Sequence, residues 1–424
     1  MATMSWVGRA AATADVWTYT VGGTVEIGDI FILTIGGKSL SVSATTTSAA
    51  TTATEIATAW NALDSGLYPE FSRITAAATS GGAGTLTADD EGVPFTVSAS
   101  TTESNGGAAD AQTFGVSNST VATGPNYWSN ANNWSGGALP ANGDTAYLQG
   151  IDVPVKYGLD QSAVTLAALY IDADFTAAVG LPEENADGGA TYYEYREQYL
   201  KVGATSLVVG RGSSGQGSGL LRINTGTAQT DLLLYRTGSS EVSDVPAFWW
   251  KGTHAANTVS VLRGDLGIAV RGGEVATVVT LKVGYETGET TDSTVRVGLG
   301  VTLTTLEMQG GTVELQAAAT TITKSGGSLE ILGSAAYTTL NNWRGEVVYR
   351  SSGTITTLNT SGRVDFSRDM RARTVTSTVA YAGAEILDPQ STVTWTNGVD
   401  LQGCGMREVS LDLGRHITVT PSAI

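Results

Sequence analysis

Apolar and polar residues alternate along much of the second half of the chain. The runs 303–306 and 313–315 follow this pattern, and threonine and valine recur throughout the region. Alternation with a period of two predicts half-buried strands, and β-branched residues suit the pleated surface of a sheet. The pattern therefore predicts a chain built mainly from short β-strands.

A short internal repeat organises residues 301–386. Four glycines, each followed by a strand-like run, stand 16, 18 and 17 residues apart, and a looser copy follows at Gly383; the four are Gly311, Gly327, Gly345 and Gly362. A unit this short cannot bury its own apolar side and must stack on its neighbours. The repeat predicts a right-handed parallel β-helix, a solenoid, over residues 153–390. An antiparallel β-sandwich with coincidental spacing is the alternative.

The N-terminal quarter has a different pattern, which predicts a small α+β, β-rich module over residues 17–100. Runs 30–35 and 40–43 flank Gly36-Gly37, a two-residue turn signal that predicts a hairpin. Residues 54–63 place Ile56, Trp60 and Leu63 on one helical face, which predicts a helix packed on the sheet. Residues 1–16 are interpreted as an N-terminal arm.

Part of this module is similar to a known kind of protein. The segments 21–38, 86–89 and 92–97, with the helix between them, resemble a small β-rich module that recurs in virion proteins of tailed bacteriophages. The resemblance covers about a quarter of the chain, and its motif consists mostly of turns and alternation. It implies that the chain is a structural protein of a phage virion.

The remaining segments are assigned by composition. Residues 101–126 lack an apolar pattern and are predicted to be a linker. Residues 127–152 contain Trp128 and Trp134, which either cap the open apolar end of the β-helix or form a platform that stacks on a sugar. Residues 391–424 are interpreted as a C-terminal cap.

Two groups of aromatic residues are candidates for contacts with other molecules. Trp6 and Trp17 are predicted to anchor the chain to a particle, because buried aromatics dominate many interfaces. Residues 180–199 interrupt the repeat with a loop and an aromatic, charged run, and solenoid insertions often form the contact face. Its candidate interface residues are Tyr192, Tyr193, Tyr195, Arg196 and Tyr199; a side hairpin packed on its own strands is the alternative.

Charge excludes some partners. The 424-residue chain has a net charge of −17 and only 15% charged residues, with no basic cluster. Nucleic acid and anionic membranes are therefore not expected as partners. A single cysteine excludes a disulfide framework, and the first residues do not form a secretory signal peptide. The expected location is a virion assembled in the host cytoplasm.

The sequence offers little catalytic chemistry. The two histidines, His254 and His416, lie far apart, and with one cysteine they cannot form a dense metal cluster. Acidic residues such as Asp265, Glu274 and Glu307 lie along the repeat, and Glu314 and Glu330 should stack in adjacent turns. Such acids are more often a solvated ladder than a catalytic pair. No catalytic residue, metal or cofactor is predicted.

Three functions remain from these observations. The first is a homotrimeric decoration, or cement, protein of a phage capsid, in contact with capsid or tail proteins. The second is a tail spike or fibre that binds a host surface glycan. The third is a β-helical enzyme that cleaves polysaccharides, which would need paired carboxylates on one face. The predicted absence of a catalytic centre favours the first two.

Overall fold

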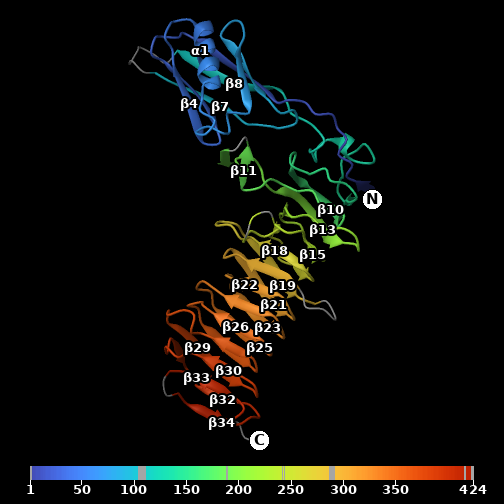
Figure 1. Cartoon of the computed structure of the whole chain (residues 1–424), viewed down its shortest axis with the longest axis vertical. Helices are drawn as coiled ribbons and strands as arrows, with labels where there is room; N and C mark the ends of the chain where they lie inside the picture. The colour runs from blue at the N-terminus through green and yellow to red at the C-terminus, as the bar shows by residue number, and fades with distance from the viewer. Residues whose placement is uncertain are drawn as a thin grey trace.

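The computed structural model describes residues 2–103, 111–187, 190–240, 242, 244–285, 292–414 and 417–421. The chain is mainly β, with 47% of residues in strands and 4% in helix, and it contains a large parallel sheet of more than 20 strands. A small N-terminal module lies at one end of the molecule, and the parallel strands extend from it towards the C-terminus (Figure 1). Within the described residues, no helix is both long and apolar enough to cross a membrane.

The N-terminal module combines two antiparallel sheets with one helix. One sheet has the order β5-β6-β2-β8 and the other the order β4-β3-β7. The elements are β2 (Val16–Gly23), β3 (Ile30–Ile35), β4 (Lys38–Ser43), α1 (Ala49–Asn61), β5 (Ile74–Ala78), β6 (Ala83–Ala88), β7 (Ser98–Thr102) and β8 (Gln112–Thr120).

The local signals of the module account for much of its structure. Strands β3 and β4 pair antiparallel around Gly36 and Gly37, both with positive φ, so the predicted hairpin is confirmed. Helix α1 begins at Ala49, earlier than predicted, because Ser48 caps it by accepting a hydrogen bond from the Thr51 N–H. Its apolar face, including Ile56 and Trp60, is buried in the core of the module.

The parallel strands form two interleaved sets, which we call the first and second ladders. Both start from β10 (Asp160–Asp172), which pairs with β13 (Leu200–Arg211). The later part of β13, residues 206–209, then pairs with the next strand of the first ladder, and residues 200–201 pair with the first strand of the second ladder. The first ladder continues through β15 (Asp231–Leu234), β17 (Thr258–Val261), β19 (Ala276–Val283), β21 (Val301–Met308), β23 (Ala319–Lys324), β25 (Tyr337–Asn342), β27 (Ile355–Thr360), β29 (Arg373–Ala380), β31 (Val393–Trp395), β32 (Val399–Leu401) and β34 (Val419–Pro421).

The second ladder runs through the strands between these. It consists of β14 (Leu221–Asn224), β16 (Phe248–Lys251), β18 (Gly264–Ile268), β20 (Ser293–Val297), β22 (Thr312–Leu315), β24 (Ser328–Ile331), β26 (Glu346–Tyr349), β28 (Arg363–Asp365), β30 (Glu385–Leu387) and β33 (Ser410–Asp412). From β14 to β30, strands that follow one another in the sequence thus belong to different ladders, and each pairs with the strand two places away.

Register follows the repeat. Leu306, Ile322, Leu340 and Leu358 align across neighbouring strands, and all four side chains are fully buried. Each fully buried leucine or isoleucine contributes about 1.5–3 kcal/mol relative to an exposed one. The corner glycines Gly311, Gly327 and Gly345 have φ between 74° and 78°, a conformation that glycine adopts without the steric cost of a Cβ.

The parallel pairing extends beyond the predicted boundaries. At the N-terminal end, β1 (Thr3–Ser5) pairs with β9 (Thr145–Leu148), and β9 pairs with β10. Residues 1–16, interpreted as an arm, therefore contribute a strand to the sheet. At the other end, β31–β34 continue the parallel pairing beyond residue 390, where a cap was expected.

Two further segments differ from their predictions. The predicted linker 101–126 contains β8, which pairs along all of β2, so much of it belongs to the module. The insertion at 180–199 contains a short antiparallel hairpin of β11 (Glu184–Asp187) and β12 (Ala190–Tyr193). A 3₁₀ turn, η1 (Ala131–Asn133), lies in the segment that precedes the ladders.

Candidate functional site

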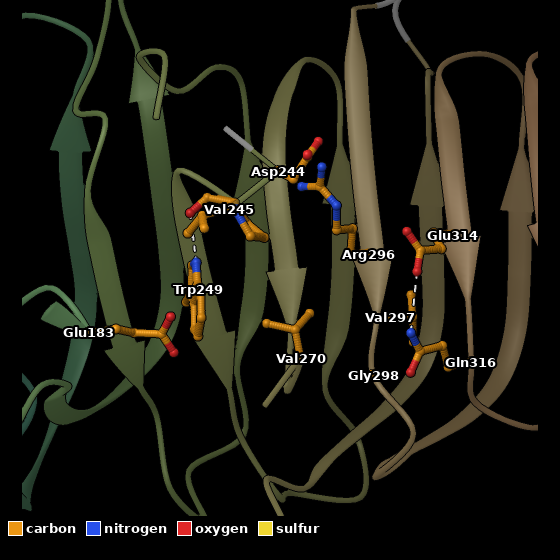
Figure 2. A pocket seen from close by; sticks show the side chains of 11 residues that line it. Glu183, Asp244, Val245, Trp249, Val270, Arg296, Val297, Gly298, Glu314 and Gln316 are labelled. Carbon is orange, nitrogen blue, oxygen red and sulfur yellow. Dashed lines mark hydrogen bonds between the residues drawn. The ribbon is translucent and has the colours of Figure 1, made fainter. Parts of the chain in front are cut away.

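A concave surface lies on the outer side of the second ladder. Two cavities of about 240 and 520 Å³ adjoin there and share the lining residues Glu183, Val245, Pro246 and Trp249. Figure 2 shows Trp249 and Val245 beside Val270, with Arg296 and Glu314 on the strands that follow. We call this surface the Trp249 groove. Its volume suits a small molecule, because ligand pockets usually measure about 300–1,000 Å³.

Alternation along β16 explains why Trp249 lies in the groove. Phe248 and Trp250 belong to the core between the ladders, so the intervening Trp249 faces the opposite way. Its ring Nε1–H donates to the Pro246 carbonyl over 2.6 Å, and its side chain is 5% exposed. The next residue in register on β18 is Gly267, which leaves space for Pro246.

Two guanidinium groups cover the Trp249 ring. Arg222 of β14 lies in register with Trp249, and its guanidinium carbon is 4.1 Å from the ring centroid. The Arg271 guanidinium carbon lies 5.0 Å from the same ring. A cation over an indole face is attracted by the ring quadrupole, and the attraction increases when water is excluded.

Most cations around the groove have a carboxylate partner. Lys251 pairs with Glu274 at 2.8 Å, Arg296 pairs with Asp265 at 3.1 Å, and Arg271 pairs with Glu183. Arg222 differs, because its Nε and Nη1 atoms are buried without a hydrogen-bond partner among the described residues. Burial first, and the charge of Arg271 second, lower the pKa of Arg222. The groove therefore contains a buried cation with unused donors.

The predicted interface loop lies between the module and the parallel strands. Arg196 pairs with Glu194 at 2.7 Å and donates to the Pro94 carbonyl of the module at 3.2 Å. Tyr195 packs on the core of the module. The Tyr192 ring centroid lies 6.2 Å from that of Tyr195, and the Tyr192 hydroxyl accepts a hydrogen bond from Arg196 Nη2 at 3.3 Å.

The other two tyrosines of this loop differ in exposure. Tyr199 is buried, with the Lys251 ammonium 3.9 Å from its ring centroid, whereas Tyr193 is 78% exposed. The segment thus makes contacts within the chain, and Tyr195 and Arg196 make theirs with the N-terminal module. Of its predicted interface residues, Tyr193 retains most of its surface for another molecule.

The predicted cap residues form a buried tryptophan cluster with Trp6. The rings of Trp128 and Trp134 are 4.6 Å apart, and those of Trp6 and Trp134 are 5.3 Å apart. All three side chains are at most 2% exposed and belong to the core of the parallel sheet. No ring face is accessible for a sugar, so the platform interpretation of Trp128 and Trp134 is corrected.

The burial of Trp6 also speaks against its predicted role as a particle anchor. Its Nε1–H donates to the Val153 carbonyl over 2.9 Å, so it fixes the N-terminal segment to the chain itself. Trp17 is half-buried in the module, where its Nε1–H donates to the Phe95 carbonyl over 3.1 Å. Both tryptophans therefore make structural contacts within the chain.

The acidic residues considered for catalysis are spread over several strands. Glu314 and Glu330 align across β22 and β24, which confirms the predicted stacking. Glu330 pairs with Arg350 at 2.8 Å, and Glu307 accepts a hydrogen bond from the Tyr285 hydroxyl at 3.0 Å. Burial raises the pKa of Asp265, and Arg296 opposes the shift. Of the two histidines, His416 lies outside the described residues.

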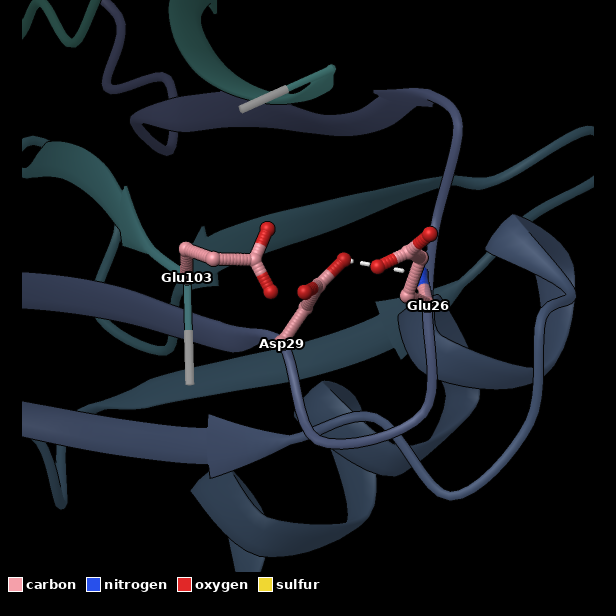
Figure 3. Close-up of side chains that lie close together, drawn as sticks. All are labelled: Glu26, Asp29 and Glu103. Atoms are coloured by element: carbon pink, nitrogen blue, oxygen red, sulfur yellow. Dashed lines mark hydrogen bonds between the residues drawn. The ribbon is translucent and has the colours of Figure 1, made fainter. Parts of the chain in front are cut away.

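Three carboxylates gather in the N-terminal module. Glu26, Asp29 and Glu103 place one oxygen each within 4.8 Å of one another, and Figure 3 shows the Asp29 carboxylate between the other two. Asp29 is fully buried, and its Oδ2 accepts a hydrogen bond from the Glu26 N–H at 2.8 Å, whereas its Oδ1 has no hydrogen-bond partner in the described part of the chain. Such oxygens are the type of ligand that Ca²⁺ prefers.

We expect Asp29→Asn to raise the free energy of unfolding by about 1 kcal/mol in a chelating buffer, because it removes a buried charge next to two like charges. The asparagine carbonyl can still accept from the Glu26 N–H, and its amide can donate to a neighbouring carboxylate. Urea unfolding at pH 7 with EDTA measures the change. Glu91→Gln, in an exposed turn, is the control; a loss of stability in Asp29→Asn alone would contradict the expectation.

Comparison of the chain with models of known protein families, with curated protein sequences and with solved structures finds no match.

Sequence reasoning did not find the Trp249 groove. In the aromatic run 248–250, Phe248 and Trp250 are buried in the core between the ladders. Alternation could have indicated that Trp249 faces the other side. Its contact with Arg222, 27 residues earlier, depends on the register of β14 and β16, and the irregular segment between these strands gives no local signal for that register.

Proposed function

We propose that the chain is a structural protein of a tailed-phage virion, a homotrimeric decoration protein of the capsid. In this proposal the two ladders form one right-handed parallel β-helix that serves as a rigid shaft, and the N-terminal module is joined to its first turn. The observation that carries it is the uninterrupted register of the ladders from β13 to β34. A shaft of this kind suits projection from a surface or bridging between subunits.

The contacts between the N-terminal module and the shaft support the proposal that the two parts move together as one rigid unit. Arg196 links Glu194 and Pro94, and a small core of Ala122, Tyr127, Tyr157 and Leu181 lies between the two parts. In the proposed virion the module attaches to the particle and the shaft stands outward. The reverse arrangement, with the shaft along the capsid, is the rival, and it predicts protection of the shaft from proteases in intact particles.

The proposed trimer brings threonine-rich faces of the first ladder together around a threefold axis. Thr320, Thr338 and Thr356 are exposed at equivalent positions of β23, β25 and β27. A closed symmetric assembly buries such flat faces. We expect sedimentation velocity at micromolar concentration to give a trimer.

The variant that tests this interface is Thr338→Lys. It should shift the protein to monomers, because three like charges would meet near the threefold axis. Thr312→Lys, an exposed threonine of the second ladder, is the control and should leave the trimer intact. A wild-type protein that sediments only as a monomer would contradict the proposed trimer.

The Trp249 groove favours a second candidate, a tail spike or fibre that binds a host surface glycan. Its cavities are large enough for one or two sugar units, and its lining contains both apolar and hydrogen-bonding side chains. The carboxylates near it are mostly engaged in ion pairs, which favours binding over glycan cleavage.

A further inference from the structure

Arg222 is held in an unusual state for an arginine. Its side chain is 3% exposed, yet its Nε and Nη1 have no hydrogen-bond partner among the described residues. A buried cation is costly unless it is paired and hydrogen-bonded. The stacking on Trp249 at 4.1 Å fixes the plane of the guanidinium but satisfies none of its N–H donors. The Nε and Nη1 nitrogens are thus held in a fixed orientation, but they form no hydrogen bond that stabilises the described structure.

The carboxylates of Glu183 and Glu274 oppose the fall in the pKa of Arg222 from a distance, but Arg222 forms no ion pair among the described residues. The neighbouring cations Lys251 and Arg271 are paired with Glu274 and Glu183, respectively. Arg222 also lines the larger cavity of the groove, of about 520 Å³. A ligand in that cavity can therefore reach a cation whose desolvation has already occurred during folding, which reduces the cost of binding.

We propose that Arg222 and Trp249 form a subsite for the carboxylate of an acidic sugar. This inference rests on the second candidate function, glycan binding in the Trp249 groove. A guanidinium donates strong, charge-assisted N–H···O bonds to a carboxylate, and Nε and Nη1 of Arg222 can each donate one. Because Arg222 is the cation in this part of the groove without a carboxylate contact, it matches one negative charge.

The rest of the cavity favours a sugar that carries this charge. Asn185 and Ser240 offer hydrogen-bonding groups to hydroxyls, and Glu183 and Glu184 offer acceptors. Leu220 and Val242 supply apolar surface for the face of a sugar ring. The two glutamates also disfavour a dianion such as phosphate, and the net charge of −17 disfavours polyanions in general.

The test measures binding of D-glucuronate, D-glucose and inorganic phosphate to the full-length protein by isothermal titration calorimetry. We expect glucuronate to bind more tightly than glucose, and Arg222→Met to weaken glucuronate binding by about tenfold or more, since hydrogen bonds to charged groups are lost. Arg222→Lys should restore part of the affinity. Arg350→Met, far along the second ladder, is the control and should bind as the wild type does.

The melting temperature separates a binding role from a structural one. Because Arg222→Met removes a buried charge without ion-pair partners and keeps an apolar stem, the melting temperature should stay unchanged or rise by about 2 °C. A clear fall would show that Arg222 serves the fold and would overturn the inference.

The ligand series distinguishes the remaining outcomes. Equal binding of glucose and glucuronate, unchanged in Arg222→Met, would leave glycan binding in place and overturn the carboxylate subsite. Tighter binding of phosphate would also overturn it, since the site would then be a general anion site. Absence of binding for all three probes, and for neutral and acidic glycans on an array, would overturn both the subsite and the second candidate function.

Discussion

Truncation of Trp128 to alanine is expected to lower the free energy of unfolding by about 3–5 kcal/mol, because a large side chain is removed from a packed core. The Trp128 side chain is 1% exposed, and its ring meets Trp134 edge-on. Its main-chain carbonyl accepts a hydrogen bond from the Trp134 Nε1–H at 2.9 Å. Loss of the ring would leave a cavity where the N-terminal segment joins the first parallel strands.

The effect should extend to the N-terminal segment. Trp6 packs on Trp134, and the fully buried Asn133 accepts a hydrogen bond from the Ala10 N–H at 2.7 Å. Hydrogen exchange in Trp128→Ala should therefore increase at residues 3–10 more than at residues 320–360.

An exposed tryptophan supplies the control for this variant. Trp343 is 40% exposed and contacts Tyr381 with ring centroids 5.5 Å apart. Trp343→Ala should cost less than about 1 kcal/mol. Chemical denaturation monitored by circular dichroism measures both variants. A similar small loss in the two would show that the tryptophan cluster does not stabilise the end of the sheet.

The repeat was predictable because its information is local and periodic. Glycine spacing alone placed Glu314 opposite Glu330, and the register of β22 and β24 agrees. The hairpin at Gly36 was predictable for a similar reason, since a two-residue turn determines the pairing of the strands that flank it. Where a few adjacent residues decide the backbone path, sequence patterns were sufficient.

The contacts that were missed join segments far apart in the sequence. Strand β1 pairs with β9 about 140 residues later, and three residues of mixed polarity carry no signal for such a partner. The aromatic run at 192–199 was expected to face another molecule, but Tyr195 packs on the module instead. Composition indicates that such residues form an interface; it does not indicate whether the partner is the same chain.

The carboxylate cluster and the surroundings of Arg222 were also not predicted, because both are formed by residues from separate segments of the chain. Glu26 and Asp29 are three residues apart in the sequence, but Glu103 reaches them from the end of another strand. Neither group could be identified without the packing of the module and the ladders.

Stability should depend on pH through a buried lysine and several buried tyrosines. Lys324 is fully buried, its Nζ donates to the Arg344 carbonyl at 2.5 Å, and burial lowers its pKa to about 8. Burial raises the pKa of Tyr19 and Tyr349 to about 12, and it raises the pKa of Tyr337 as well. These shifts act in opposite directions over different ranges of pH.

The lysine should make the protein more stable as pH rises from 8 to 10. In this range the folded chain releases the Lys324 proton, whereas the unfolded chain keeps it up to its ordinary pKa of about 10.4. The unfolded state therefore binds more protons, and the free energy of unfolding increases, by about 2–3 kcal/mol over the range. Below pH 8 both states are protonated, so this contribution is constant.

The tyrosines should reverse the trend above pH 10. The unfolded chain then loses phenolic protons that the folded chain retains, so the folded state binds more protons and stability falls. Each such tyrosine costs about 1.4 kcal/mol per pH unit, and several act together, which should unfold the protein between about pH 11 and 12. The expected profile is a maximum near pH 10, measured by urea unfolding at fixed ionic strength from pH 7 to 11.5.

Two variants test which residues cause the rise and the fall of stability in this pH profile. Lys324→Met should abolish the rise between pH 8 and 10 and leave the fall above pH 10 intact. Tyr19→Phe, which loses a hydroxyl that donates to the Ala53 carbonyl at 2.9 Å, should make the fall shallower by about 1.4 kcal/mol per pH unit and leave the rise unchanged. A wild-type protein whose stability is flat between pH 8 and 10 would show that Lys324 stays charged inside the sheet, and the burial argument for its pKa would then fail.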